Sequence, residues 1–149
     1  MDFRHIIFLP GMSGHGEFWE PVAEKLRRFG HRCTLIDWPG LGDNAVDPSV
    51  AGYDDVVNVV CSHVDGPVVL VGQSMGGYVA VRTALQPDVD VMHLVLAATS
   101  GGLDMSSFDA IDWRPGSRSA HPTAPAWAFE PTADLTGEIG ALARPVLLV

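Results

Sequence analysis

The residue in this chain whose surroundings are best suited to chemistry is Ser74, in the run Gly72-Gln73-Ser74-Met75-Gly76. An apolar segment, 68–71, precedes this run, and an apolar segment with helical character, 78–85, follows it. A serine on a sharp turn between strand and helix has a strained backbone and an exposed hydroxyl, and the flanking glycines let the two elements approach without Cβ clashes. The pattern predicts that Ser74 is a nucleophile. The alternative is an ordinary strand-to-helix turn of another α/β protein, in which Ser74 is only a small residue.

The composition bounds the kind of protein that could hold such a serine. A chain of 149 residues with 47% hydrophobic and 18% charged residues is typical of one globular domain. The formal charge of −9, with nine Lys and Arg that form no basic run, disfavours a polyanionic partner, so we expect no nucleic acid. The same composition predicts no membrane-spanning segment. The histidines and cysteines show no metal-ligand spacing, so we expect no metal.

The N-terminus and the cysteines suggest a compartment. The first residues lead directly into an apolar run, without the basic and long apolar regions of a signal peptide. Cys33 and Cys61 lie at the start of one apolar run and the end of another, which favours buried or half-buried thiols over a disulfide. We therefore expect a reducing, cytoplasmic compartment.

Strand-like and helix-like segments alternate along the chain. Short apolar runs typical of parallel strands buried on both faces are residues 6–9, 34–36, 68–71, 94–97 and 146–149. Helical stripes lie between them, formed by Trp19, Val22, Ala23 and Leu26, which Gly30 should terminate, and by Tyr53, Val56, Val57 and Val60. The segment after Ser74 gives a third helix. The pattern predicts an α/β fold, a mostly parallel sheet flanked by helices, as a single domain over 1–149.

The regular pattern ends in residues 100–144. This segment is rich in Gly, Pro, Ser and Thr and carries large apolar residues, namely Leu103, Met105, Phe108, Ile111, Trp113, Trp127 and Phe129. One interpretation is a short lid or cap insertion, which would predict a partly apolar substrate. The other is an irregular connection whose aromatic residues cover the core.

Three motifs carry a resemblance to a known family. Residues 9–14 (L-P-G-M-S-G) are similar to an oxyanion loop after a first core strand, and residues 37–42 (D-W-P-G-L-G) to a D-x-P-G-x-G turn. Residues 72–77 (G-Q-S-M-G-G) are similar to a G-H-S-M-G-G nucleophile elbow, with Gln in place of the common His. Together, from the first strand to the last residue, the chain resembles the α/β-hydrolase superfamily of serine hydrolases.

The resemblance implies a site and a reaction. Ser74 would be the nucleophile, and the backbone N–H groups of Met12 and Met75 would form the oxyanion hole. Gly11, Gly72 and Gly76 would be the glycines of the oxyanion loop and the elbow. The implied activity is cofactor-independent hydrolysis of a small ester or thioester through an acyl-enzyme, although lyases, acyltransferases and perhydrolases share the elbow. A dehalogenase would need a carboxylate at position 74.

The resemblance also implies partners for Ser74 that the sequence does not contain. In this family the order is serine, acid, histidine. The acid follows a strand similar to 144–149, and the histidine follows one further strand, so both positions would fall beyond Val149. An apolar strand at the end of the chain leads us to expect a truncated chain that lacks the last strand or strands.

Two alternatives use only the residues of the sequence. Asp104 and His121 follow Ser74 in the family's order, although no strand precedes His121 to place it, and Asp104 is more simply a solvated carboxylate. The protein could instead be a non-catalytic pseudoenzyme or a binding module of the same fold.

His15, after the oxyanion loop, is expected to be a solvated loop residue. The oligomeric state is open.

Overall fold

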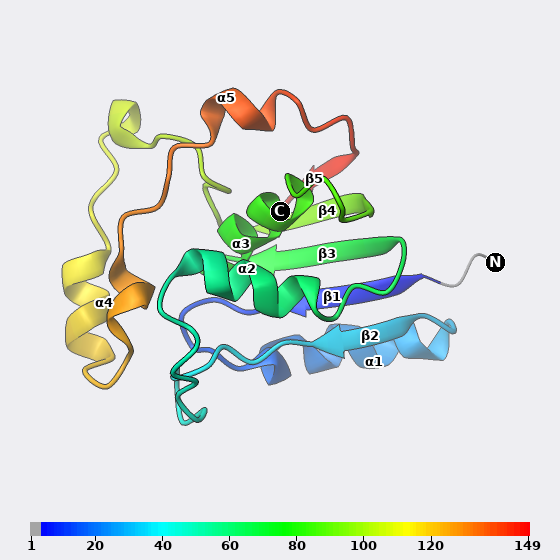
Figure 1. The fold of residues 1–149 in the computed structure, drawn as a ribbon, viewed down its shortest axis with the longest axis horizontal. Coiled ribbons are helices and arrows are strands. Elements are labelled where there is room, and N and C mark those ends of the chain that lie inside the picture. Colours follow the sequence, from blue (N-terminus) through cyan, green and yellow to red (C-terminus); the bar gives the residue numbers. More distant parts are fainter. Residues whose placement is uncertain (1–3) are drawn as a thin grey trace.

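A computed structural model describes residues 4–149, and its core is a parallel sheet of five strands (Figure 1). The strands are β1 (His5–Leu9), β2 (Arg32–Leu35), β3 (Val68–Gln73), β4 (Val91–Ala97) and β5 (Val146–Leu148). Their order across the sheet is β2-β1-β3-β4-β5, and every neighbouring pair is parallel. The predicted α/β class, with a parallel sheet flanked by helices, is confirmed.

The central strands are the apolar runs of the sequence. All five residues of β1 are buried, and β1 pairs with β3 from His5 opposite Val68 to Leu9 opposite Gly72. The two edge strands differ from the prediction of burial on both faces. Residues of β2 are exposed or half-buried, and all three residues of β5 are exposed. An edge strand has a neighbour on one side only, and too little of the described chain covers β5.

Three helices flank the sheet, α1 (Glu20–Arg28), α2 (Tyr53–Cys61) and α3 (Met75–Ala84). In Figure 1, α2 and α3 lie on one face of the sheet and α1 on the other. The predicted stop of α1 is confirmed, because Gly30 has a φ of 87° and donates to the carbonyl of Arg27. The stripe predicted for α1 is partly wrong, since Ala23 is fully buried but Val22 is 44% exposed. A 3-10 turn, η1 (Gly16–Trp19), ends just before α1, and the stripe that packs on the sheet is narrower than predicted, formed by Trp19, Ala23 and Leu26.

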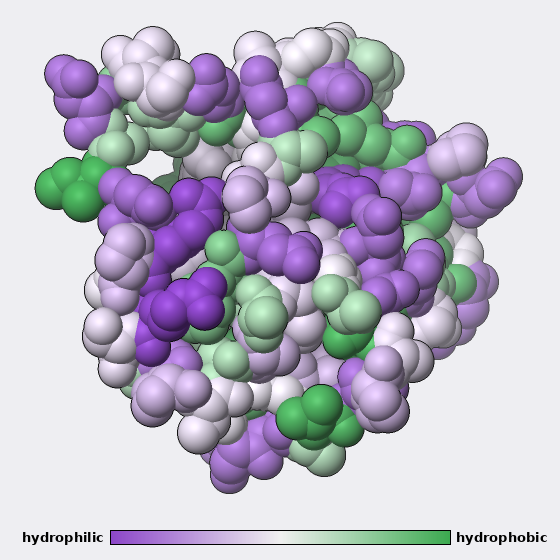
Figure 2. Space-filling view, turned by 60° about the vertical axis from the view of Figure 1, so that its left-hand side comes forward, coloured by the Kyte–Doolittle hydropathy of each residue, from purple (hydrophilic) through white to green (hydrophobic). Residues whose placement is uncertain are grey.

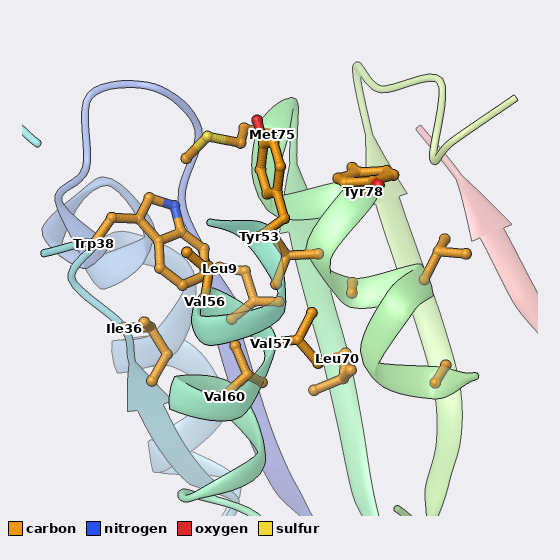
Figure 3. Packing of buried hydrophobic residues seen from close by; sticks show 14 of the residues in the cluster. Leu9, Ile36, Trp38, Tyr53, Val56, Val57, Val60, Leu70, Met75 and Tyr78 are labelled. Carbon is orange, nitrogen blue, oxygen red and sulfur yellow. The ribbon is translucent and has the colours of Figure 1, made fainter. Parts of the chain in front are cut away.

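The larger of two apolar clusters lies between the sheet and the α2–α3 layer. Figure 3 shows Leu9 and Leu70 of the sheet facing Val56, Val57 and Val60 of α2. These α2 residues are the predicted stripe, and all are buried. The smaller cluster, on the α1 face, contains Ile6, Phe8, Ala23 and Val71. More apolar residues therefore pack on the face of the sheet that α2 and α3 cover than on the α1 face.

The segment between β4 and β5 has short helices only. They are η2 (Ser106–Phe108), α4 (Arg114–Ala120), η3 (Ala126–Phe129) and α5 (Thr136–Ile139). In Figure 1, α4 lies beyond the ends at which the strands point. Its apolar residues are of two kinds. Trp127 and Phe129 are buried and cover the core, whereas Phe108 and Ile111 are 70% and 92% exposed and do not.

Two smaller features complete the fold. Cys33 and Cys61 are free and half-buried, as predicted, and burial raises the pKa of both thiols. No helix in residues 4–149 is long and apolar enough to cross a membrane.

Candidate active site

The serine lies at the turn between β3 and α3. β3 ends at Gln73, α3 begins at Met75, and Ser74 between them has φ 52° and ψ −118°. A positive φ is rare for a residue with a side chain and marks backbone strain, so the predicted strain is confirmed. The amide of Ser74 donates to the carbonyl of Ala97 (3.0 Å), and its carbonyl accepts from Gly77 (2.9 Å). Ser74 is half-buried rather than exposed as expected, since other segments overhang it.

Of the glycines around the serine, Gly72 and Gly76 are packed against backbone, and Gly11 is packed against the side chains of Gln73 and Ser74. A Cβ on Gly72 would lie 2.4 Å from the carbonyl oxygen of Gly76, and one on Gly76 would lie 2.4 Å from that of Leu9. A Cβ on Gly11 would lie 2.3 Å from Oε1 of Gln73 and 3.3 Å from Cβ of Ser74. Such distances leave no room for a side chain, so the loop after β1 rests directly on the elbow.

The loop after β1 is held by the D-W-P-G-L-G turn. Within the loop, Gly14 donates to the carbonyl of Gly11 (3.1 Å). In the turn, Oδ1 of Asp37 accepts from the amide of Gly16 (2.7 Å), and just after the turn the side-chain amide of Asn44 donates to the carbonyl of Gly14 (3.0 Å). The two motifs, residues 9–14 and 37–42, therefore form one unit in the structure.

A cavity of about 560 Å³ opens above Ser74. Met12 and Met75 line it together with Ser74, so the structure brings together the three residues that the sequence predicted as nucleophile and oxyanion donors. Figure 2, which brings the α4 side forward, shows a hollowed surface around which hydrophilic and hydrophobic residues are mixed. The residues that close the cavity on the far side come from 98–117 and 132–134.

Of the charged side chains in this wall, Arg114 and Asp112 pair with each other, whereas Asp104 and Asp134 accept hydrogen bonds from a neighbouring serine or threonine. Arg114 donates to Oδ1 of Asp112 (3.0 Å) and lies over the ring of Trp113, 5.6 Å from its centroid. Asp104 accepts from the amide and hydroxyl of Ser106 (2.9 Å each). The remaining lining is mainly apolar or small, and the buried Nε of Arg114 has no hydrogen-bond partner within residues 4–149.

Two tyrosines at the cavity were not expected there. Tyr53 and Tyr78 line it and pack edge to face, with ring centroids 5.1 Å apart. Burial, together with the nearby Tyr78 phenol, raises the pKa of Tyr53 to about 12. The hydroxyl of Tyr78 accepts from the amide of Ala133 (3.0 Å). Both residues stand at helical spacing in apolar stripes, where an aromatic residue indicates core packing and gives no sign of a site.

Residues 4–149 provide no histidine to the cavity lining. Asp104 is there, but His121 is not, and within the described chain the His121 side chain has no hydrogen bond to Ser74 or Asp104. The arrangement of Ser74, Asp104 and His121 is therefore absent. His15 lies on the surface, 38% exposed, with Nε2 3.1 Å from Oδ1 of Asp43, as expected for a loop residue.

The fold and the elbow define an α/β protein with a strained serine at the carboxyl end of a central parallel strand. The family model described as "Alpha/beta hydrolase family" matches residues 6–148. The chain therefore belongs to the alpha/beta hydrolase family.

Individual relatives agree with this family. The chain is 30% identical over 112 residues to the human protein named palmitoyl-protein thioesterase ABHD10, mitochondrial, covering 71% of this chain and 37% of that protein. It is 34% identical over 96 residues to a pimeloyl-[acyl-carrier protein] methyl ester esterase of Nitrosomonas europaea, covering 64% and 37%. A hydrolase from Pseudomonas aeruginosa has the same fold, with a TM-score of 0.70 at 20% identity over 98% of this chain and 71% of that one. The chain spans 37% of the length of these two curated relatives.

Proposed function

We propose that this chain carries the nucleophile and the oxyanion hole of a serine hydrolase that cleaves a small ester or thioester through an acyl-enzyme on Ser74. The observation that carries the proposal is the strained Ser74, with φ 52°, at the base of a cavity that Met12 and Met75 also line. Strain of this kind persists where the surrounding structure enforces it, and it is concentrated at functional sites. A turn with no chemical role would have no need of it.

The proposed reaction follows from this arrangement. Oγ of Ser74 attacks the carbonyl carbon, its proton passes to a general base, and the carbonyl oxygen becomes negative. The backbone N–H groups of Met12 and Met75 donate to that oxygen, and the C–O or C–S bond then breaks as the leaving group takes the proton. Water repeats the sequence to release the acid and restore the serine.

The general base and the acid that orients it are proposed to lie outside residues 1–149. No histidine of the described chain lines the cavity, whereas the matched relatives are longer than this chain. The serine hydroxyl is a weak nucleophile without such a base. We therefore propose catalysis for the native-length protein, which would include the general base.

The cavity favours a substrate with an apolar part. Its apolar lining includes Met12, Met75, Leu103, Met105 and Ile111. Within residues 100–144, the part that lines the cavity, 103–114, would form the lid over the serine, whereas 127–129 are buried in the core and do not line the cavity. The two relatives, which are named as a thioesterase and a methyl ester esterase, support esters and thioesters as the substrate class.

The test uses the native-length gene product and a fluorophosphonate probe. We expect the probe to label the wild type and the protein to hydrolyse p-nitrophenyl acetate or butyrate, with Ser74→Ala losing both. Ser119→Ala is the matched control, because Ser119 is an exposed serine outside the cavity lining. Labelling that survives in Ser74→Ala contradicts the assignment. A folded wild type that is neither labelled nor active supports the alternative, a non-catalytic binding module.

We also propose a reducing compartment such as the cytoplasm. The two half-buried thiols, both free, support this. Thiol alkylation in cell lysate under denaturing conditions should modify both Cys33 and Cys61, and a disulfide found in the native protein would contradict the proposal.

A further inference from the structure

Two indole side chains hold consecutive carbonyl groups at the end of β1. Nε1 of Trp19 donates to the carbonyl of Leu9 (3.1 Å), and Nε1 of Trp38 donates to the carbonyl of Pro10 (2.8 Å). Trp19 packs with the cluster on the α1 face, and Trp38 belongs to the main core on the other face. The loop that carries Met12 therefore starts from two carbonyls fixed from opposite sides of the sheet.

Trp38 also holds the far end of this loop. Its backbone amide donates to the carbonyl of Gly14 (2.8 Å), while its indole donates to that of Pro10. One fully buried residue thus connects both ends of the turn in which Met12 lies. In Figure 3 the indole nitrogen of Trp38 points toward the loop, and the ring lies beside Leu9 and Val56.

The same two carbonyls set the distance between the loop and the elbow. A Cβ on Gly76 would lie 2.4 Å from the carbonyl oxygen of Leu9 and 2.6 Å from that of Pro10. Gly76 is two residues after Ser74, so a change in the direction of the Pro10 carbonyl moves the loop relative to the serine. Oxyanion donors act only when they are held at hydrogen-bond distance from the developing charge.

We propose that Trp38 is a positioning residue for catalysis: its indole N–H fixes the Pro10 carbonyl and so aims the Met12 amide at the oxyanion formed on Ser74. The inference rests on the proposed function, because it needs a reaction at Ser74. Trp38 does not line the cavity, so a substrate bound there would not contact it. A purely structural role would lower stability without a selective loss of the chemical step.

The first experiment compares Trp38→Phe with Trp127→Phe in the native-length protein. Trp127 is also a buried indole, 3% exposed, but its N–H has no hydrogen-bond partner within residues 4–149. We expect Trp38→Phe to lower kcat for p-nitrophenyl acetate and kinact for the fluorophosphonate by about 10- to 100-fold, with KI for the probe within about threefold. Trp127→Phe should keep kinact within about threefold at a similar loss of Tm.

A second measurement does not depend on activity. Hydrogen–deuterium exchange of amides in residues 11–16 should be at least about tenfold faster in Trp38→Phe than in Trp127→Phe, since the loop loses one of its anchors. If Trp38→Phe fails to fold, an isosteric benzothienyl analogue of tryptophan at position 38 removes only the N–H. It should give the same kinetic and exchange changes.

The outcomes separate the two proposals. An inactive, unlabelled wild type whose loop exchange still depends on Trp38 would refute the hydrolase and, with it, the catalytic role of Trp38. An active wild type with unchanged kinact in a folded Trp38→Phe or in the isostere would overturn the positioning role alone. A loss confined to KI would also overturn it.

Discussion

The contact between Gly76 and the end of β1 makes a sharp test of how the site is built. In Gly76→Ala the new Cβ would lie 2.4 Å from the Leu9 carbonyl oxygen, about 1 Å short of the 3.4 Å at which ordinary contact begins. The obstructing atoms are backbone, at the end of a fully buried strand. They cannot rotate away as a side chain would, so α3 or the loop must move.

The magnitude is the difference of two effects. Alanine in a helix interior is favoured over glycine by about 1 kcal/mol. Overpacking a tight contact costs about 1–3 kcal/mol, and rigid backbone places Gly76→Ala at the upper end. We expect a net loss of about 2 kcal/mol, which corresponds to a Tm about 4–8 °C lower for a domain of roughly 150–250 residues and to a smaller shift for a longer one.

Gly116→Ala is the matched control, because Gly116 also lies in a helix and a Cβ there would meet nothing within 4 Å. This variant should gain about 0.5–1 kcal/mol and unfold slightly above the wild type. Both are measured by thermal and denaturant unfolding of the native-length protein. If Gly76→Ala unfolds at or above the wild-type temperature, the close packing of loop and elbow is refuted.

Three further predictions concern ionisable groups. Burial and the nearby Arg32 lower the pKa of His5 below 6.5 in the folded protein. The stability that neutral His5 contributes is therefore fully present above pH 6.5 and is lost as the pH falls toward the folded-state pKa. His5→Gln should therefore show a smaller loss of denaturant midpoint than the wild type between pH 7.5 and 5. An equal loss in both proteins would contradict this. The Tyr53 phenol, with a pKa of about 12, should contribute no absorbance change at 295 nm below about pH 11, so Tyr53→Phe should leave the titration curve up to that pH unaltered. Burial raises the pKa of Cys33, so the native protein should react with a thiol reagent at pH 8 more slowly at Cys33 than a denatured sample does; equal rates would refute the burial.

The sequence was sufficient for the parts of the fold that depend on burial. Residues 68–71 are an uninterrupted apolar run, and β3 lies at the centre of the sheet. The elbow was predictable because glycine at 72 and 76 has a local, steric cause. Edge position is a different matter: residues 146–148 have the same composition as a central strand, but only the topology shows that they are exposed.

The cavity depends on contacts between distant segments and was only partly predictable. Met12 was placed by its motif, whereas Tyr53 reaches the cavity from the start of α2, at a position that also fits a core stripe. The segment 100–144 could not be divided from the sequence, because its apolar residues have no period. The two hydrogen bonds of Trp38 could not be predicted from the sequence. Hydrogen bonds to the backbone carbonyls of a distant loop leave no pattern in the residues around the tryptophan.

The left-handed backbone of Ser74 affects which residue at position 74 gives the most stable protein. A residue with a side chain held at φ 52° costs about 1–3 kcal/mol, and glycine adopts such a conformation freely. Selection for heat resistance alone, applied to random variants, should therefore enrich glycine at position 74. The most stable descendants of this chain would be those that had lost the serine proposed as its nucleophile.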